Sequence, residues 1–211
     1  ECCTMISFER YKKIGILGGT FNPVHIGHLL MAEHAKKVAD LDVVILMPSC
    51  KSYMKAGTNV LSGKERLEML KLSTEGNSNL ITSDMEINRG GNTYTYETLL
   101  QMKSLCPQSE IYFIVGADSL FSMERWVKPE MIFANCTLLA AGRDGASKED
   151  LLLKKADLEK RFNAKIILLD FPQIDISSTV IRENIKNHES IRYMVHDNVL
   201  NYIQENHLYE D

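Results

Sequence analysis

The chain has 211 residues, 45% of them hydrophobic, and a formal net charge of −4. This length and apolar fraction are typical of one globular domain, and the slightly negative charge disfavours a broad basic surface that would hold a nucleic-acid backbone. No apolar run approaches the roughly 18 residues that a membrane span requires. We therefore expect a cytoplasmic protein without nucleic-acid or membrane partners.

The beginning of the chain and its cysteines carry no functional signal. Residues 1–13 lack the apolar centre of a signal peptide. Met5 could be a natural start, so residues 1–10 are interpreted as an N-terminal extension and residues 11–211 as the domain. The five cysteines are odd in number and contain no Cys-x-x-Cys pair, which favours reduced thiols. The oligomeric state stays open, and a homo-oligomer is possible.

Five apolar runs, rich in Ile, Val and Leu, are typical of strands that are buried on both faces. They cover residues 12–17, 43–47, 110–115, 137–141 and 165–169. Apolar residues at helical spacing lie between and after these runs. They form four faces: Leu29, Ala32, Ala35 and Val38 or Ala39; Tyr96, Leu99 and Leu100; Leu151, Leu152, Ala156, Leu158 and Phe162; and Val195, Val199, Tyr202 and Ile203.

A further helix is predicted to begin at the capping box Ser62-Gly-Lys-Glu65. Strands that alternate with helices over short connections predict an α/β fold, in which a parallel sheet is covered on both faces. We expect one Rossmann-like, doubly wound domain. In such sheets ligands bind beyond the carboxyl ends of the strands, so the functional residues should follow the strands directly.

The first strand is followed by Gly18-Gly-Thr-Phe-Asn-Pro-Val-His-Ile-Gly-His28 and then by a helix. Glycines let a backbone approach a ligand closely, and a helix N-terminus attracts phosphate. His25 and His28 are three positions apart, so their rings can point to the same side. A histidine alone would more often satisfy a local turn, and a metal site is disfavoured because no third ligand stands nearby at suitable spacing.

The last strand is followed by Asp175-Ile-Ser-Ser-Thr-Val-Ile-Arg182. The three hydroxyl residues suit a helix start, where they can cap backbone N–H groups or share those groups with phosphate oxygens. Arg182 lies one turn further on, and its forked donors can reach the same anion. Taken alone, this string would most simply be a capped helix with a solvated arginine.

Together the two strings resemble the two motifs of the nucleotidyltransferase superfamily that is named for its His-x-Gly-His sequence. The resemblance implies that His25 and His28 contact ATP phosphates, and that Arg182 holds the β- and γ-phosphates together with the hydroxyls beside it. It also implies that Gly116 and Asp118 line the adenosine. The implied ATP-binding residues are Gly18, Gly19, Thr20, Phe21, Gly116, Asp118, Ile176, Ser177, Ser178 and Thr179.

The middle of the chain resembles the bacterial nicotinate-nucleotide adenylyltransferase family. Asn92-Thr-Tyr-Thr-Tyr-Glu-Thr-Leu99 is similar to its Ser-Tyr-Thr-x-x-Thr-Leu stretch, and the segment that ends at Leu120 is similar to its Gly-x-Asp-Ser-Leu stretch. Trp126 follows six residues later, where the family places a tryptophan that stacks on the pyridine ring. The implied residues for the nicotinate nucleotide are Asn22, Thr93, Tyr94, Thr95, Trp126 and Val127.

The loop after the second strand departs from the family. Many relatives carry Pro-Pro-His-Lys there, whereas this chain has Pro48-Ser-Cys-Lys-Ser-Tyr-Met-Lys55, so Lys55, with Lys51, is left to meet phosphates. The predicted catalytic residues are thus His25, His28, Lys55 and Arg182.

The expected reaction is adenylyl transfer from ATP to nicotinate mononucleotide, which gives deamido-NAD and pyrophosphate in NAD biosynthesis. Mg²⁺ would arrive with ATP, because the sequence offers no carboxylate cluster for a dedicated metal site. Nicotinamide mononucleotide or pantetheine phosphate as acceptor, or a non-catalytic nucleotide sensor, remain alternatives. A truncated aminoacyl-tRNA synthetase is disfavoured because the chain is short and lacks that family's lysine-rich second signature.

Overall fold

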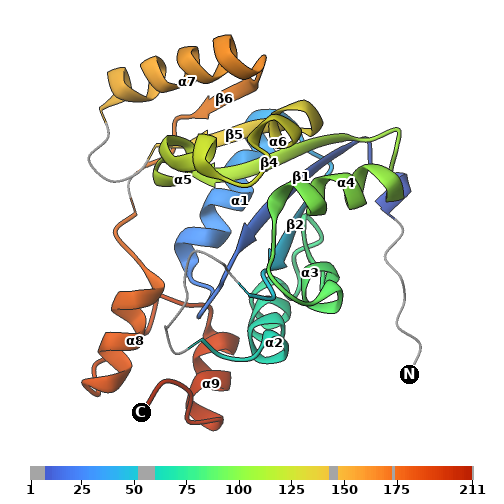
Figure 1. Cartoon of the computed structure of the whole chain (residues 1–211). Coiled ribbons are helices and arrows are strands. Elements are labelled where there is room, and N and C mark those ends of the chain that lie inside the picture. The colour runs from blue at the N-terminus through green and yellow to red at the C-terminus, as the bar shows by residue number, and fades with distance from the viewer. Residues whose placement is uncertain (1–7, 52–59, 143–146, 173, 211) are drawn as a thin grey trace.

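Six parallel strands form one sheet in the order β3-β2-β1-β4-β5-β6 (Figure 1). The computed structural model describes residues 8–51, 60–142, 147–172 and 174–210. The strands are β1 (Lys13–Gly19), β2 (Val43–Pro48), β3 (Leu80–Thr82), β4 (Glu110–Gly116), β5 (Thr137–Ala141) and β6 (Lys165–Leu169). The helices are η1 (Phe8–Arg10), α1 (Ile26–Ala39), α2 (Gly63–Thr74), α3 (Met85–Arg89), α4 (Thr95–Leu105), α5 (Ala117–Ser122), η2 (Met123–Arg125), α6 (Pro129–Asn135), α7 (Lys148–Phe162), α8 (Ser178–Lys186) and α9 (Asp197–Glu205).

The direction of winding changes between the neighbouring strands β1 and β4. From β1 the chain proceeds outward to β2 and β3, and from β4 it proceeds outward to β5 and β6. At such a switch point the loops that follow the two strands diverge to opposite faces and leave a crevice for a ligand. The predicted doubly wound, Rossmann-like single domain is therefore confirmed.

The core has two halves, one on each face of the sheet. Along β1, Ile14 and Ile16 join one half and Leu17 joins the other, because successive side chains of a strand point to opposite faces. Helices α3, α4, α6 and α7 cover the first half, and α1, α2, α8 and α9 cover the second. Burial on both faces explains why the strands read as continuous apolar runs.

Several details differ from the sequence prediction. Strand β3 was not predicted, because three residues at a sheet edge make too short an apolar run to be recognised. Val38, Leu100 and Leu152, which were expected on buried helix faces, are exposed by 47%, 39% and 50%. Each of these helices packs on the sheet from one side only, so its buried stripe is narrower than its apolar spacing suggests.

The described part of the N-terminal extension packs against the domain. Phe8 in η1 and the adjacent Tyr11 contact the first half of the core, and Ser109 donates a hydrogen bond to the Tyr11 carbonyl at 2.6 Å. The described cysteines are free thiols. Cys136 is buried, and its removal from water raises the pKa of its thiol to about 12.

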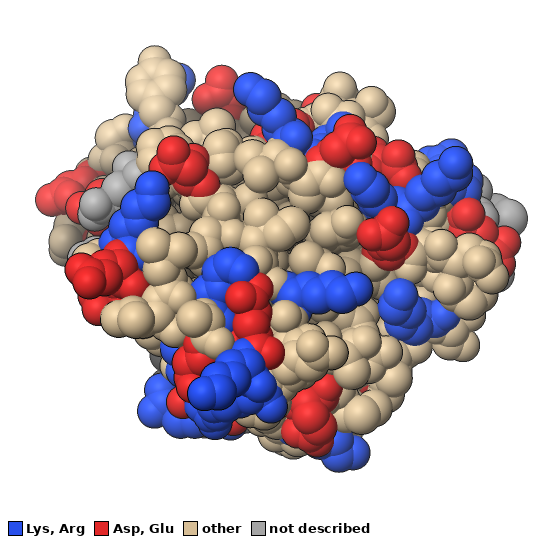
Figure 2. Space-filling model, turned by 90° about the horizontal axis from the view of Figure 1, so that it is seen from above, with Lys and Arg blue, Asp and Glu red and all other residues tan. Residues whose placement is uncertain are grey.

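No helix in the described ranges is long and apolar enough to cross a membrane. On the face shown in Figure 2, Lys and Arg are interspersed with Asp and Glu rather than gathered in one broad patch.

Candidate active site

The loop between β1 and α1 brings its two histidines together. His25 occupies the N-cap position of α1, and its backbone N–H donates to Nδ1 of His28 at 3.2 Å. The two rings are stacked, with centroids 3.7 Å apart and planes inclined by 28°. Spacing in the sequence predicts this shared side, and the structure places both rings at the start of the helix, where an anion is favoured.

The Phe21 side chain packs against the residues of this loop. It is 2% exposed and contacts the His28 ring edge-on, with centroids 4.9 Å apart. A Cβ atom added to Gly19 would lie 3.2 Å from the Phe21 ring, so the glycine allows the ring to pack there. The Phe21 side chain therefore packs within the protein and supports the loop.

The segment that leads into α8 and forms its first turns, called the second loop below, contacts the first loop directly. Ser178 Oγ donates to the Pro23 carbonyl at 2.8 Å, and Arg182 Nη1 donates to the Asn22 carbonyl at 2.7 Å. In Figure 1 the chain crosses from β6 to α8, which lies at the end toward which the β1 arrow points. The two predicted motifs, more than 150 residues apart in sequence, therefore form one surface.

The hydroxyl residues of this second loop have separate roles. Ser177 caps α8 by accepting the Val180 N–H at 3.2 Å, as the simple capping interpretation predicts. Thr179 Oγ1 accepts a hydrogen bond of 3.4 Å from Arg182 Nη2. Ile176 packs against the second half of the core. Arg182 thus sits between its own helix start and the first loop, with its guanidinium held in a defined orientation.

Asn22 is buried by contacts from two distant segments. Its Oδ1 accepts hydrogen bonds from the Tyr209 hydroxyl at 2.9 Å and from the Leu61 N–H at 3.2 Å, and the residue is only 4% exposed. Nicotinate-nucleotide binding was implied for Asn22 by resemblance. In the structure its side-chain oxygen binds the protein and fixes the first loop.

Changing Tyr209 to Phe is expected to lower the free energy of unfolding at neutral pH. It should also make this free energy depend less on pH in the alkaline range. Burial raises the pKa of Tyr209, although the positive charges of Arg182 and Arg66 oppose the shift. A raised pKa adds stability that is fully present below the ordinary tyrosine value of about 10 and is lost as the pH rises above it. Losing one hydrogen bond costs about 1 kcal/mol.

Urea unfolding of both proteins at several pH values between neutral and strongly alkaline would measure this effect. The difference in unfolding free energy should shrink as the pH rises. A difference that stays constant across this range would contradict the assignment.

Gly116 and Asp118 lie on the other side of the switch point. Gly116 ends β4 and caps α5, and a Cβ atom added to it would meet no atom within 4 Å. The space beside its Cα is open, which allows a ligand to approach the backbone closely. Asp118 is exposed in the first turn of α5. Since β4 pairs with β1, the end of β4 at Gly116 lies beside the end of β1, where the first loop begins.

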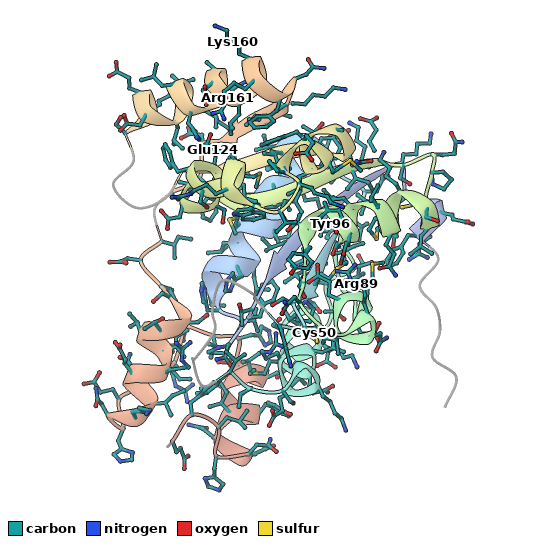
Figure 3. The ribbon with its side chains drawn as sticks, viewed as in Figure 1. Cys50, Arg89, Tyr96, Glu124, Lys160 and Arg161 are labelled. Carbon is teal, nitrogen blue, oxygen red and sulfur yellow. The ribbon has the colours of Figure 1, made fainter. Side chains whose placement is uncertain are left out.

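The residues that were predicted to hold the nicotinate nucleotide lie near the carboxyl end of β2. Thr93 Oγ1 accepts the Cys50 N–H at 3.0 Å, and the Thr93 N–H donates to the Lys51 carbonyl at 3.0 Å. Tyr94 caps α4 and Thr95 begins it. Figure 3 labels Cys50, which follows β2, and Tyr96 in α4. Lys51 is exposed, and Lys55 lies outside the described residues.

Trp126 and Val127 approach the same region from the connection between η2 and α6. Lys128, the next residue, places its Nζ 4.5 Å from the centroid of the Tyr96 ring. The Trp126 ring meets Phe113 edge-on, with centroids 6.5 Å apart, and its Nε1 is buried without a partner in the described part of the chain. Val127 is 40% exposed. The contact of Lys128 with Tyr96 thus places this segment beside the start of α4.

Glu124, two residues before Trp126, is anchored to α7. It accepts hydrogen bonds from Lys154 Nζ at 3.0 Å and from Arg161 Nη1 at 2.7 Å (Figure 3). These contacts lower the pKa of Glu124, chiefly through the Lys154 hydrogen bond. They hold η2, and with it the tryptophan segment, against α7.

Two residues of this region were missed by sequence reasoning. Arg66 in α2 is 1% exposed and donates to the main-chain carbonyls of Thr20 and Ser49, each at 2.7 Å. Arg66 lies three positions before Met69 and four before Leu70, so helical spacing puts its charge on the apolar face of α2. A charge at such a position could have been recognised from the sequence. Tyr209 gave no comparable signal.

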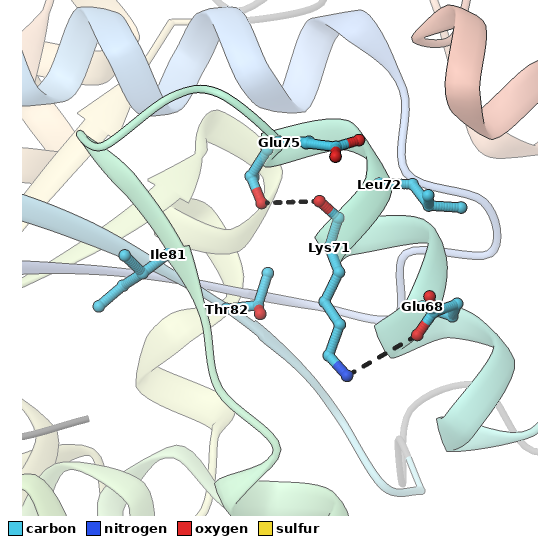
Figure 4. A pocket seen from close by; sticks show the side chains of 7 residues that line it. Glu68, Lys71, Leu72, Glu75, Ile81 and Thr82 are labelled. Carbon is cyan, nitrogen blue, oxygen red and sulfur yellow. Dashed lines mark hydrogen bonds and ion pairs between the residues drawn. The ribbon is translucent and has the colours of Figure 1, made fainter. Parts of the chain in front are cut away.

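A shallow pocket of about 440 Å³ lies elsewhere, between α2 and β3 (Figure 4). Glu68, Lys71 and Glu75 lie on its wall, and Lys71 Nζ is 3.7 Å from Glu68 Oε2. None of the predicted site residues lines this pocket, and its two carboxylates disfavour phosphate. The acidic lining therefore disfavours this pocket as a site for a triphosphate.

The fold and the two joined loops define a nucleotide-binding α/β domain, and residues 16–184 match the cytidylyltransferase-like family. The chain belongs to this family. It is 40% identical over 198 residues to the probable nicotinate-nucleotide adenylyltransferase of Lachnoclostridium phytofermentans, covering 94% of this chain and 99% of the relative. It is 39% identical over 198 residues to a protein of the same name from Dehalococcoides mccartyi, covering 93% and 97%.

Among solved structures, the chain resembles the nicotinic acid mononucleotide adenylyltransferase of Plasmodium falciparum complexed with NaAD. The TM-score is 0.78 at 21% identity, and the match covers 94% of this chain and 98% of that one. This likeness supports the fold that the sheet order already defines.

Proposed function

We propose that the chain transfers the adenylyl group of ATP to the 5′-phosphate of nicotinate mononucleotide, which yields deamido-NAD and pyrophosphate. The observation that carries this proposal is the contact between the two loops. Arg182 and Ser178 bond to Asn22 and Pro23, beside the stacked pair of His25 and His28. The shared name of relatives at about 40% identity over nearly the whole chain supports the choice of acceptor.

The physical problem in this reaction is the repulsion between two anions, so charge neutralisation and alignment must supply most of the catalysis. An oxygen of the acceptor phosphate forms a bond to the α-phosphorus. The bond from that phosphorus to the oxygen that bridges to the β-phosphate breaks, and pyrophosphate leaves. No covalent bond to the protein is required, because the acceptor phosphate is itself a nucleophile at neutral pH.

Different side chains are proposed to bind ATP, the adenylyl donor, and the acceptor nucleotide. His25 and His28 hydrogen-bond α- and β-phosphate oxygens, while Arg182, with Ser178 and Thr179, holds the leaving pyrophosphate. By resemblance, Lys55 lies between donor and acceptor. The described residues contain no group of three or more His, Cys, Asp or Glu side chains that could hold a metal ion. In this proposal ATP enters as its Mg²⁺ complex, and the magnesium ion is part of the substrate.

A panel of acceptors tests the proposal. Purified protein with MgATP should release pyrophosphate fastest with nicotinate mononucleotide, at least about tenfold faster in kcat/KM than with nicotinamide mononucleotide or pantetheine phosphate. Only the nicotinate ring carries a carboxylate, and a hydrogen bond to a charged group is worth about 1.5–3 kcal/mol. A preference for another acceptor would overturn the assignment of the substrate. Absence of pyrophosphate release with every acceptor, despite binding of ATP, would instead indicate a nucleotide sensor.

A further inference from the structure

Arg66 is the bulkiest of the fully buried side chains among the described residues, and its guanidinium contacts three separate segments of main chain. Nε donates to the Leu61 carbonyl at 2.9 Å and Nη1 to the Thr20 carbonyl at 2.7 Å. Nη2 donates to the Ser49 carbonyl at 2.7 Å and to the Cys50 carbonyl at 3.3 Å. Only a planar fork with several donors can satisfy such a set of acceptors.

These acceptors belong to different parts of the active-site region. Thr20 lies in the loop after β1, where the triphosphate is proposed to bind. Ser49 and Cys50 follow β2, on the side of the acceptor nucleotide, and Leu61 precedes α2. All four acceptors are neutral peptide oxygens. Burial lowers the pKa of Arg66, yet an arginine in a protein stays protonated.

Burying a cation without a carboxylate partner is a costly way to gain stability. A matched apolar side chain would fill the same volume on α2 without that cost, since the neighbouring Met69 and Leu70 are completely buried. The arrangement of donors therefore points to a role in fixing the positions of the loops.

Other hydrogen bonds extend the connection on both sides. The Ser49 N–H donates to the Gly19 carbonyl at 2.9 Å, so the two loops also touch directly. The Cys50 N–H is held by Thr93 at 3.0 Å, which continues the network to the start of α4. The Leu61 N–H bonds Asn22, which Arg182 also contacts. Arg66 lies at the centre of this network.

We propose that Arg66 is a positioning residue that holds the loop after β1 against the loop after β2, so that the two phosphates meet in line. This inference rests on the proposed function. In a reaction that depends on alignment, a displacement of about 1 Å can cost a hundredfold in rate. Arg66 would therefore act on turnover more than on the binding of either substrate alone.

Changing Arg66 to Lys tests this role, because lysine keeps the charge and loses the fork. We expect kcat to fall about tenfold while KM for ATP and for the acceptor each change less than about threefold, since alignment and not binding is lost. The matched control is Leu70→Ala, one turn along the same helix and also fully buried. It opens a cavity and lowers stability, but should leave kcat within about twofold of the wild-type value.

Amide hydrogen exchange gives a second readout that does not need turnover. In Arg66→Lys the amides of Ser49, Cys50 and Leu61 should exchange at least about tenfold faster than in Leu70→Ala, because their loops lose a shared anchor. The proposal is overturned if kcat of Arg66→Lys stays within about twofold of wild type or if the two variants exchange alike at these amides. If the wild-type protein itself releases no pyrophosphate, the proposed function fails, and the exchange comparison alone decides the role of Arg66.

Discussion

Replacing His28 with alanine should lower turnover about a hundredfold or more, because the loss of one preorganised donor to a developing charge costs about 3 kcal/mol. The ring of His28 stacks on His25 at the N-terminus of α1, where a phosphate oxygen would gain both a side-chain donor and the helix dipole. The fold decrease in kcat is expected to exceed the fold increase in KM for ATP. Steady-state kinetics with a pyrophosphate-coupled assay would measure both constants.

Two further variants separate the chemistry of His28 from its structural role. His28 Nδ1 accepts the His25 N–H, and asparagine at this position offers Oδ1 as a similar acceptor. His28→Asn should therefore keep the thermal stability of the wild-type protein and still lose activity. His196 caps α9 in a comparable way, by accepting the Asn198 N–H at 3.2 Å, so His196→Ala should cost stability alone. Wild-type kcat in His28→Asn would show that only the capping hydrogen bond matters.

Replacing Arg182 with alanine is expected to be similarly severe, with a loss of about a hundredfold in kcat/KM for ATP. Two effects combine, because the variant loses the proposed grip on pyrophosphate and also the 2.7 Å hydrogen bond to the Asn22 carbonyl that joins the two loops. Arg182→Lys should recover only part of the rate, since a lysine keeps the charge but not the geometry of the fork.

The exposed Arg192 supplies the control for Arg182, because it follows α8 without contacting either loop in the described structure. Arg192→Ala should leave kcat/KM for ATP unchanged. Isothermal titration with a non-hydrolysable ATP analogue would complement the kinetics. If Arg182→Ala binds the analogue and turns over like the wild-type protein, Arg182 has no role in binding or catalysis and its hydrogen bond to Asn22 is structural only.

The sequence could predict the parts of this site that are built locally. Strands buried on both faces form continuous apolar runs, so most of the sheet could be located without coordinates. His25 and His28 are close in sequence at a helix start, and their stacking follows from helical spacing. The resemblance of the two strings to one superfamily implies that both contact the same ATP, and the hydrogen bond from Arg182 to the Asn22 carbonyl shows that the two segments meet.

The parts that sequence reasoning missed depend on contacts between distant residues. Arg66 bonds a carbonyl 46 positions away, and Tyr209 bonds a side chain 187 positions away. A hydrogen bond to a peptide carbonyl requires no particular residue type as its acceptor, so no pattern in the sequence reveals it. Likewise, the exposure of Leu152 depends on which neighbours the folded chain provides and not on helical spacing.

The dependence of the first loop on remote segments has a consequence for how the protein acquires its activity. Asn22 and Pro23 accept hydrogen bonds from residues 178, 182 and 209. The loop that carries His25 and His28 is therefore complete only after the C-terminal segment has packed against it. Contacts of such long sequence separation form late in folding and slow it. Intermediates that already contain the central strands should therefore be inactive, and recovery of catalysis after dilution from denaturant should lag behind recovery of secondary structure.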